Sequence, residues 1–256
     1  MKITINIHKS VQENAAYYYE RGKRSKKKIE GAERAYRETL KKIENVELKK
    51  QQQVEKIERK KQWFEKFRWY VSSEGRLVIG GRDATTNDII IKKYLEQNDL
   101  VFHTQLKGSP FVVIKTEGAK PTQEEKEEAA IFCASNSKQW SANISLADVY
   151  YIKPEQVKKE FGLPKGSFMI YGERTYMKAP LELAVGVFQD NRVMCGPLNA
   201  VKKQCRQVLG IKQGSVKKSD AAKKIRYFFH QKGKVDIAVD DIMQALPPGD
   251  CDVKEI

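Results

Sequence analysis

The stretch between Ser10 and Phe67 constrains the fold of this chain more than any other. It contains no proline, and Gly22 and Gly31 are its only glycines. Because proline and glycine are the residues that most often interrupt helices, the stretch predicts one long helix. About 50 helical residues would extend roughly 75 Å at 1.5 Å per residue, far beyond a compact domain of this size. We therefore expect an arm.

Apolar residues recur along this stretch with a seven-residue period. The first heptad positions are Ile29, Tyr36, Ile43, Lys50, Ile57 and Phe64, and the fourth positions are Ala32, Thr39, Val46, Gln53, Lys60 and Phe67. Most of them are apolar, as in a coiled coil, although polar residues interrupt the stripe in its second half. A stripe this narrow cannot bury itself, so the sequence predicts a partner coiled-coil helix.

The chain begins with a short segment of alternating character. Ile3, Ile5 and Ile7 alternate with polar residues, which predicts a strand, and Ser10 is suited to cap the helix that follows. The start lacks the apolar core of a signal peptide, and no apolar run approaches the roughly 20 residues that a membrane helix needs. We therefore expect no membrane partner and a cytoplasmic location.

After Phe67 the composition changes to aromatic and β-branched runs separated by glycine and proline turns. These runs predict strands at 69–71, 77–79, 100–102, 111–114, 149–152 and 167–170, and helices near 85–95, capped by Thr85 or Thr86, and 121–138. From about residue 180 the pattern predicts strands at 183–188 and 192–195 and helices from about 199, 219 and 241. The fold class is therefore α+β, with a coiled-coil arm at 1–67, a mixed sheet-and-helix domain at 68–178 and a basic α/β extension at 179–256.

Basic residues outnumber acidic ones and gather at both ends of the chain. The totals are 48 Lys+Arg and 33 Asp+Glu, a net charge of +15. Residues 1–68 carry 20 basic and 10 acidic side chains, and nine basic residues stand between Lys202 and Arg226 against Asp220 alone. Such clusters attract phosphate backbones by releasing counterions, and a solvated lysine-rich surface explains the same charges equally well.

The segment from Gly80 to Ala84 admits two interpretations. It links a strand to a helix start, where backbone N–H groups and the Arg82 guanidinium can bind a phosphate. A tight turn that needs two glycines, with Asp83 as a helix cap, explains the same residues. Its spacing is that of neither a Walker loop nor a dinucleotide-binding loop.

Further basic and aromatic residues suit RNA. Lys92 and Lys93 fall on the helix after this turn, and His103 follows an apolar strand, where it can stack on a nucleotide or, more commonly, be a buried side chain that orders a loop. Lys165, Arg174 and an aromatic residue surround the strand predicted at 167–170, which suits a looped or single-stranded RNA, although an ordinary hairpin edge explains these residues slightly better.

The sequence offers little for catalysis or for metal binding. Its three histidines stand in no nucleophile-elbow or H-E-x-x-H setting, and its four cysteines form no C-x-x-C pair. We therefore expect reduced thiols, no metal, no cofactor and no enzymatic activity.

Motifs along the whole chain resemble the NFACT family. Ser10–Ala15, Tyr18–Tyr19 and Lys28–Ala32 resemble the returning arm of its central coiled coil, Trp69–Lys115, Leu163–Ile170 and Gly172–Tyr176 resemble its RNA-binding module, and Gly196-Pro197 with Lys217–Lys223 resembles the extension of its archaeal members. The resemblance implies a ribosome quality control factor. Such a factor binds tRNA and rRNA on the large ribosomal subunit after a stalled ribosome has split, and in many lineages it adds an untemplated tail to the nascent chain.

The chain also departs from the family pattern. Thr104-Gln105 and Ser109 stand where members commonly have Ala-Asp and Ala-Pro. Members also carry an amino-terminal domain, a helix-hairpin-helix segment and an outgoing coiled-coil arm before the point where this sequence starts. We therefore expect a fragment or one half of a split protein, and we expect the missing amino-terminal half or a second chain to supply the partner coiled-coil helix.

These inferences predict a non-enzymatic module that binds RNA and takes part in the rescue of stalled ribosomes. The expected RNA contacts are Arg82, Lys92, Lys93, His103, Lys107, Lys165 and Arg174. One alternative is a coiled-coil interaction scaffold with no direct role for RNA. A less favoured one is a nucleic-acid-processing enzyme that would use Asp83, Asp99 and His103.

Overall fold

The computed structural model describes residues 3–51, 61–106 and 108–256, with the backbone alone for 41–51. The chain divides into two compact units, Met1–Arg59 and Lys60–Ile256. Every buried apolar residue among those described belongs to the second unit. The boundary expected near residue 179 stays a prediction.

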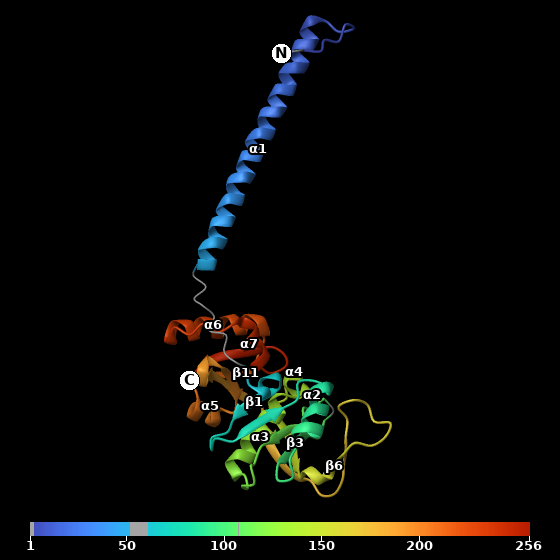
Figure 1. Cartoon of the computed structure of the whole chain (residues 1–256), viewed down its shortest axis with the longest axis vertical. Helices are drawn as coiled ribbons and strands as arrows, with labels where there is room; N and C mark the ends of the chain where they lie inside the picture. Colours follow the sequence, from blue (N-terminus) through green and yellow to red (C-terminus); the bar gives the residue numbers. More distant parts are fainter. Residues whose placement is uncertain (1–2, 52–60, 107) are drawn as a thin grey trace. The chain divides into compact units, whose positions relative to one another are not determined.

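The first unit is built on one helix, α1, which spans Val11–Gln51 (Figure 1). Ser10 caps this helix as predicted, because the Glu13 backbone N–H donates to Ser10 Oγ at 3.2 Å and the Glu13 carboxylate accepts from the Ser10 N–H at 2.8 Å. The heptad positions from Ile43 to Lys60 lie outside the residues whose side chains the structure describes. Of the remaining positions, Ile29 and Tyr36 are exposed.

The strand predicted at the start of the chain is wrong. Residues 3–10 form an irregular segment with a turn. Asn14 is the reason, because its side chain accepts from the Asn6 N–H at 2.9 Å and donates to the Asn6 carbonyl at 3.0 Å. The Tyr18 hydroxyl adds a bond to the Thr4 carbonyl at 2.5 Å. These bonds bind the segment to the first turns of α1.

The prediction that the long helix continues to Phe67 is also wrong. Trp63–Lys66 form a short 3₁₀ helix, η1, and the Phe67 side chain is fully buried in the second unit. The Trp63 ring stacks on the Tyr94 ring with 4.6 Å between centroids. Phe64 and Phe67, which fit the heptad pattern, therefore belong to the core of the second unit, since large aromatic side chains gain most from full burial.

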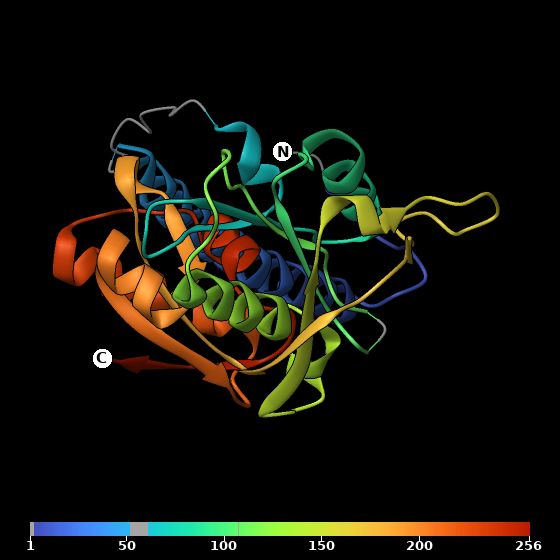
Figure 2. The ribbon, with the colours of Figure 1, turned by 90° about the horizontal axis from the view of Figure 1, so that it is seen from below.

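Two antiparallel sheets form the described framework of the second unit. The six-stranded sheet has the order β1 (Arg68–Val71), β2 (Leu77–Gly80), β4 (Val112–Ile114), β3 (Leu100–Thr104), β5 (Leu146–Ile152) and β8 (Thr175–Pro180). The four-stranded sheet has the order β10 (Val193–Gly196), β9 (Glu182–Val187), β11 (Arg206–Gln213) and β12 (Cys251–Glu255). A small hairpin, β6 (Val157–Lys158) with β7 (Met169–Ile170), completes the pairing (Figure 2).

Helices connect and cover these sheets. They are α2 (Ala84–Ile89) with the π-helix η2 (Ile90–Tyr94), α3 (Gln123–Ser135), α4 (Lys138–Ser141), α5 (Leu198–Gln204), α6 (Lys218–Gly233) and α7 (Val239–Ala245), with 3₁₀ turns η3 (Pro154–Gln156) and η4 (Gln189–Asn191). The predicted α+β class is confirmed. None of the helices that the structure describes is both long and apolar enough to span a membrane.

Helix α3 covers one face of the six-stranded sheet. Its Phe132 ring lies 4.8 Å from the Tyr70 ring, and its Lys126 ammonium lies 5.4 Å from the Tyr151 ring. Tyr151 is paired with Phe102 on the neighbouring strand, so both point toward α3. The residues that alternate with them, His103 and Tyr150, point to the opposite face.

The segment after residue 180 packs against the first sheet. The Val71 N–H donates to Met194 Sδ at 3.2 Å, and the Trp69 and Phe188 rings lie 5.7 Å apart. The Trp140 indole N–H donates to the Asp250 carbonyl at 3.0 Å. The two sheets therefore share one core.

Candidate nucleic-acid interface

A row of three rings crosses the face of the six-stranded sheet opposite α3. His103 on β3 pairs with Tyr150 on β5, and Tyr150 pairs with Tyr176 on β8. Directly paired residues place their side chains on the same face, and the ring centroids are 6.0 Å and 5.6 Å apart. We call His103, Tyr150 and Tyr176 the ring row.

Arg174 joins the ring row from the segment that leads into β8. Its guanidinium carbon lies 4.9 Å from the Tyr150 ring centroid, a cation–π distance. Tyr150 is only 3% exposed, whereas Tyr176 is 52% exposed and Arg174 is exposed as well. The Tyr176 ring and the Arg174 guanidinium are therefore exposed, and both pack against the buried Tyr150 ring.

His103 contributes a ring and hydrogen bonds to this row. Burial lowers the pKa of His103 below its usual value, and the positive charge of Arg174 lowers it further. Because a carbonyl oxygen can only accept, the 2.6 Å contact to the Thr104 carbonyl places the proton on Nδ1. His103 is therefore mostly neutral at pH 7, and its bond to the Thr104 carbonyl orients the ring at the end of β3.

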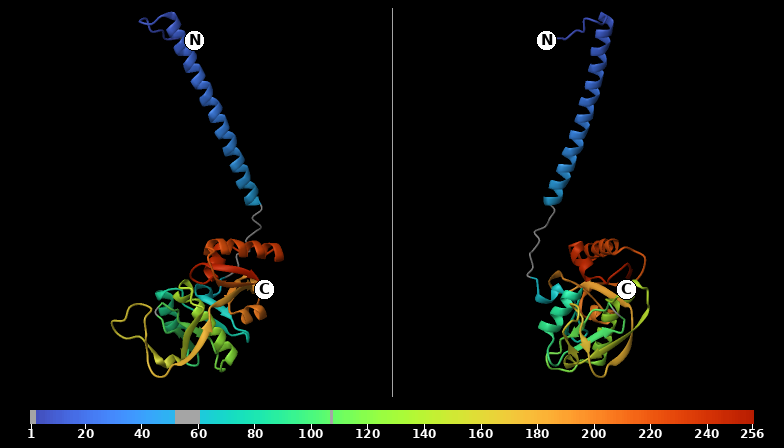
Figure 3. Two further views of the ribbon diagram at one scale, coloured as in Figure 1. Left: turned by 180° about the vertical axis from the view of Figure 1, so that it is seen from behind. Right: turned by 90° about the vertical axis from the view of Figure 1, so that its right-hand side faces the viewer.

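The β6–β7 hairpin loop borders the ring row on one side. The Phe111 ring lies 4.7 Å from His103 and 5.5 Å from Phe168 of this loop. The Lys159 ammonium stands 5.1 Å from the Phe168 ring. The rest of the loop, drawn in yellow, extends away from the second unit and carries a fully exposed Phe161 (Figure 3).

Asp88 connects this hairpin loop to the basic helix. Its carboxylate pairs with Lys92 at 2.6 Å and Lys159 at 3.7 Å, and it accepts from the Gly166 N–H at 3.2 Å. The hydrogen bond from Lys92 is the largest of the effects that hold the pKa of Asp88 below its usual value. The carboxylate stays ionised at neutral pH and keeps Lys92 beside the loop that carries Lys165.

Arg82 has a different environment from the other predicted contacts. Its guanidinium donates to the backbone carbonyls of Phe67 at 2.9 Å, Gln244 at 2.9 Å and Glu65 at 3.3 Å. These bonds connect η1, α2 and α7. The structure therefore uses the Arg82 side chain to join elements of the second unit and does not bring it to the ring row.

The turn around Arg82 has the helix-cap geometry. Asp83 caps α2 by accepting from the Thr86 N–H at 2.8 Å, and this bond is the largest effect holding the pKa of Asp83 below its usual value. The cap expected at Thr85 or Thr86 is thus Asp83, with Thr86 as its partner. A β-carbon at Gly81 would meet Asn87 Oδ1 at 1.8 Å and the Asn87 backbone nitrogen at 3.2 Å, so close packing against Asn87 is sufficient to explain the glycine.

Most of the other predicted RNA contacts are exposed side chains. Lys92 and Lys93 on η2, Lys165 on the hairpin loop and Arg174 are exposed. Lys107 lies outside the residues that the structure describes. The sequence did not single out Tyr150, Asp88 or Lys159, because strand register and loop docking bring them to the site. Their placement leaves no local signal in the sequence.

Neither a metal site nor a reactive thiol stands out in the described chain. Over residues 3–51, 61–106 and 108–256, no group of three or more His, Cys, Asp or Glu side chains could hold a metal ion. The four cysteines are free, and burial raises the pKa of Cys133, Cys195 and Cys205 to about 12 and that of Cys251 to about 11. Thiols protonated in this way are unreactive at neutral pH.

Comparison with known proteins gives this surface a context. The NFACT protein RNA binding domain matches residues 66–172, which include all of the ring row except Tyr176. The archaeal Rqc2 homolog aRqcH of Methanocaldococcus jannaschii is 40% identical over 206 residues, which cover 77% of this chain and 30% of that protein. The ribosome quality control complex subunit NEMF of Homo sapiens is 36% identical over 176 residues, or 64% of this chain and 16% of its own length.

The ribosome quality control complex subunit 2 of Saccharomyces cerevisiae is 28% identical over 192 residues, covering 70% of this chain and 18% of the yeast protein. This chain therefore spans less than a third of each of these relatives. The matched domain and the matched relatives agree with each other, and they agree with the motifs from Trp69 to Tyr176. The chain belongs to the NFACT family.

Proposed function

We propose that this chain is the part of a ribosome quality control factor that binds RNA, with tRNA and the rRNA of the large ribosomal subunit as its targets. The observation that carries the proposal is the ring row with Arg174, which lies on the sheet face opposite α3, in and beside the matched RNA-binding domain, and exposes Tyr176 and Arg174. The relatives named as ribosome quality control factors supply the cellular context.

The chemistry of the surface suits an unpaired stretch of RNA. A base can stack on the exposed Tyr176 ring, and the Arg174 guanidinium can stack or bind a phosphate. Lys92, Lys93 and Lys165 supply further positive charge around the hairpin loop. Contacts of this kind bind RNA and need no chemical step, so we assign the chain a binding role in the rescue of stalled ribosomes, in the cytoplasm and without catalysis of its own.

The first test is binding of the whole chain to large ribosomal subunits and to tRNA across a salt series. We expect saturable binding that prefers free large subunits over whole ribosomes and weakens with salt. The Y176A variant should lose about fivefold or more in RNA affinity, because stacking is worth ~1–3 kcal/mol per base, while Y176F should retain it. R174Q should both weaken binding and flatten the salt dependence.

A matched control is K202Q, which removes one exposed cation outside the strands that carry the ring row. Equal effects of this control and of R174Q would mean that the chain binds RNA only through its net charge. Unchanged binding in Y176A would remove the ring row from the interface.

A second candidate function is a coiled-coil scaffold. Its support is the exposed apolar stripe on α1, where Ile29 is 59% exposed and Tyr36 is 65% exposed. A helical partner would cover this stripe. The distinguishing measurement is association with such a helix in high salt. I29N/Y36N should abolish this association and leave binding of a short RNA strand unchanged.

A further inference from the structure

Helix α6 carries a dense group of cations outside the matched RNA-binding domain, which ends at residue 172. The basic residues on the helix and at its ends are Lys217, Lys218, Lys223, Lys224, Arg226, Lys232 and Lys234, and Asp220 is the one acidic residue between Lys217 and Lys234. Lys218 is set apart by burial, which lowers its pKa to about 8, and by a hydrogen bond of 3.0 Å to the Leu246 carbonyl. The others project into solvent.

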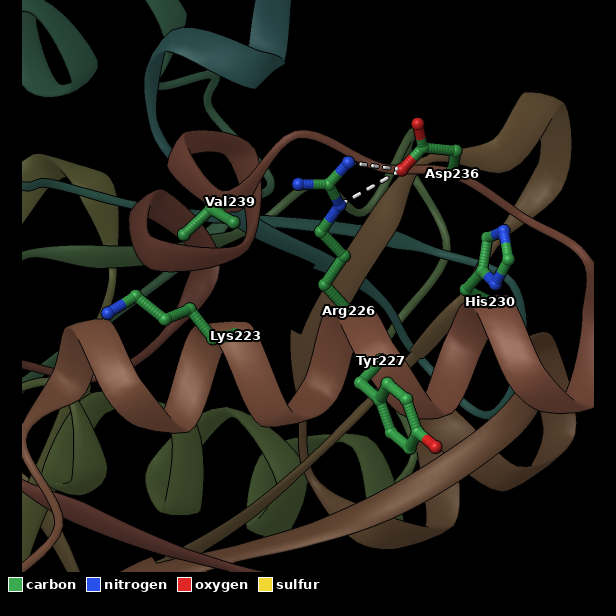
Figure 4. Close-up of a pocket in the computed structure, with 6 residues that line it drawn as sticks. All are labelled: Lys223, Arg226, Tyr227, His230, Asp236 and Val239. Carbon is green, nitrogen blue, oxygen red and sulfur yellow. Dashed lines mark hydrogen bonds and ion pairs between the residues drawn. The ribbon is translucent and has the colours of Figure 1, made fainter. Parts of the chain in front are cut away.

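Only part of this charge is neutralised within the chain. Lys223 pairs with Asp220 at 2.9 Å, and Arg226 pairs with Asp236 at 2.9 Å (Figure 4). Lys217, Lys224, Lys232 and Lys234 form no ion pair with any residue that the structure describes. The helix therefore presents four uncompensated cations.

The buried apolar side chains of α6 lie on one side of the helix. Ala221, Ala222, Ile225 and Phe229 are buried against the second unit. With 3.6 residues per turn, Tyr227 falls on the side opposite these residues, whereas Lys217 and Lys224 fall at the edge of the buried face, about 10 Å apart along the axis. Tyr227 is 68% exposed, so its ring contributes little to the core. The burial of α6 does not explain why an aromatic ring stands at this position.

A surface pocket of about 340 Å³ lies beside this ring. It is lined by Lys223, Arg226, Tyr227 and His230 of α6 and by Asp236 and Val239 of the following segment (Figure 4). An accessible ring at the margin of a pocket, among basic side chains, has the composition of sites that hold an unpaired base and its phosphates.

We propose that α6 is a second RNA-contact surface, in which Lys217, Lys224, Lys232 and Lys234 bind the phosphates of one strand and an unpaired base stacks on Tyr227. The surface is separate from the ring row, and it rests on the proposed function only in taking RNA as the partner. Cations that bind phosphates release counterions, so each contact contributes to the salt dependence of binding.

The test measures binding of a labelled, unstructured RNA strand of about 16 nucleotides to the whole chain across a salt series. K217Q/K224Q should lower the slope of log affinity against log salt by about 1.4, because each contact to single-stranded RNA contributes about 0.7. The control K120Q/K202Q removes the same charge from exposed positions elsewhere and should leave the slope unchanged.

The stacking step has its own variants. Y227A should weaken binding by about fivefold or more, whereas Y227F keeps the ring and should bind as the unmodified chain does. Each variant is accepted only when its thermal unfolding midpoint matches that of the unmodified chain. Equal affinities and slopes for K217Q/K224Q, Y227A and the control would overturn the proposal and leave α6 a solvated basic helix.

Two further outcomes are decisive. If R174Q and Y176A reduce RNA binding while the α6 variants do not, the ring row stands and the α6 surface is rejected. If only the α6 variants reduce it, the ring row is rejected and α6 stands. Competition by polyglutamate as strong as that by RNA, lost in K217Q/K224Q, would overturn the proposal in favour of an acidic protein partner.

Discussion

Asp88 is the residue on which the geometry of the candidate interface depends most. Its one carboxylate serves Lys92, Lys159 and the Gly166 N–H, which come from a helix and from two points of the hairpin loop. A carboxylate can accept several hydrogen bonds at once, whereas neither a lysine nor an aromatic ring could connect these groups. This one connection holds the loop that carries Lys165 and Phe168 against α2.

A substitution at Gly166 tests whether the β6–β7 hairpin loop packs against α2. Gly166 has a φ of +76°, and a β-carbon there would lie 2.5 Å from Ala84 Cα, so G166A should push the loop away from α2. We expect trypsin to cleave after Lys159 and Lys165 about tenfold faster, because undocking by ~1.4 kcal/mol exposes the loop ten times as often.

Gly162 provides the matched control for this prediction. Its φ of +82° imposes the same backbone strain, but a β-carbon there would meet nothing within 4 Å. G162A should therefore cost ~1–2 kcal/mol of local strain without moving the loop from α2. Cleavage that is equally fast in both variants would show that backbone strain, and not the contact with Ala84, controls the loop.

At the scale of elements, α3 holds two buried glutamates whose pKa values are shifted in opposite directions. Burial raises the pKa of Glu125, but hydrogen bonds from Ser72 and Arg76 outweigh this effect and leave it below 4.5. Burial dominates for Glu128, whose pKa is raised above 4.5 despite the bond from the Ser73 N–H at 3.1 Å. The same helix thus carries one carboxylate that stabilises the fold when ionised and one that destabilises it.

The two glutamates should give opposite pH dependences. A lowered folded-state pKa contributes stability above the unfolded value of 4.5, and this stability is lost as pH falls through the folded pKa. E125Q should therefore lower the free energy of unfolding by ~1.5–3 kcal/mol at pH 7, with the difference shrinking below pH 4.5.

A raised folded-state pKa has the reverse effect. As pH rises through 4.5, Glu128 ionises first in the unfolded chain, which favours unfolding. E128Q should therefore be more stable than the unmodified chain at pH 7, by ~1 kcal/mol, and equal to it at pH 4. Urea unfolding at both pH values measures the two effects, and a pair of variants that respond alike to pH would contradict the assignment.

The elements also show what sequence patterns can and cannot predict. The central strands β2, β3 and β4 consist of aromatic and β-branched runs, so the pattern located them well. Strands β11 and β12 were not predicted, because β12 contains Asp252, Lys254 and Glu255 and β11 has a bulge between Arg206 and Leu209. Their pairing depends on neighbours that are distant in the sequence.

The candidate site was likewise predictable only where it depends on local sequence. The exposed basic residues Lys92, Lys93, Lys165 and Arg174 were predictable from composition and spacing, because charge is a local property of the sequence. The ring row depends on the register of β3, β5 and β8, and the orientation of Arg82 depends on carbonyls from residues as distant as Gln244. Long-range pairing of this kind leaves no local pattern.

At the scale of the whole molecule, the two units differ in what stabilises them. All the buried apolar residues that the structure describes lie between Phe67 and Cys251, whereas the side chains of α1 from Val11 to Leu40 are exposed except for Asn14 and Tyr18. A helix with no buried apolar face takes its stability from its own hydrogen bonds and from any partner. The second unit should therefore fold without the first.

This difference predicts the behaviour of a fragment spanning residues 61–256. It should unfold cooperatively, with a midpoint within a few degrees of the midpoint of the second unit in the whole chain, because it keeps the entire described core. Residues 1–60 hold 17 Lys+Arg and nine Asp+Glu, and 17 − 9 gives a net +8 that the fragment lacks. Binding of a short RNA strand should thus persist, with a shallower salt dependence if the arm contributes phosphate contacts.

Differential scanning calorimetry measures whether the fragment folds, and the RNA salt series measures whether it binds RNA. Loss of the cooperative transition in the fragment would mean that the second unit requires the arm to fold. A retained transition with no RNA binding would place recognition on the arm and reject both the ring row and α6. A retained transition with Y176A and K217Q/K224Q effects as large as in the whole chain would assign RNA recognition to the second unit alone, and the exposed stripe of α1 would then be free to bind a partner helix.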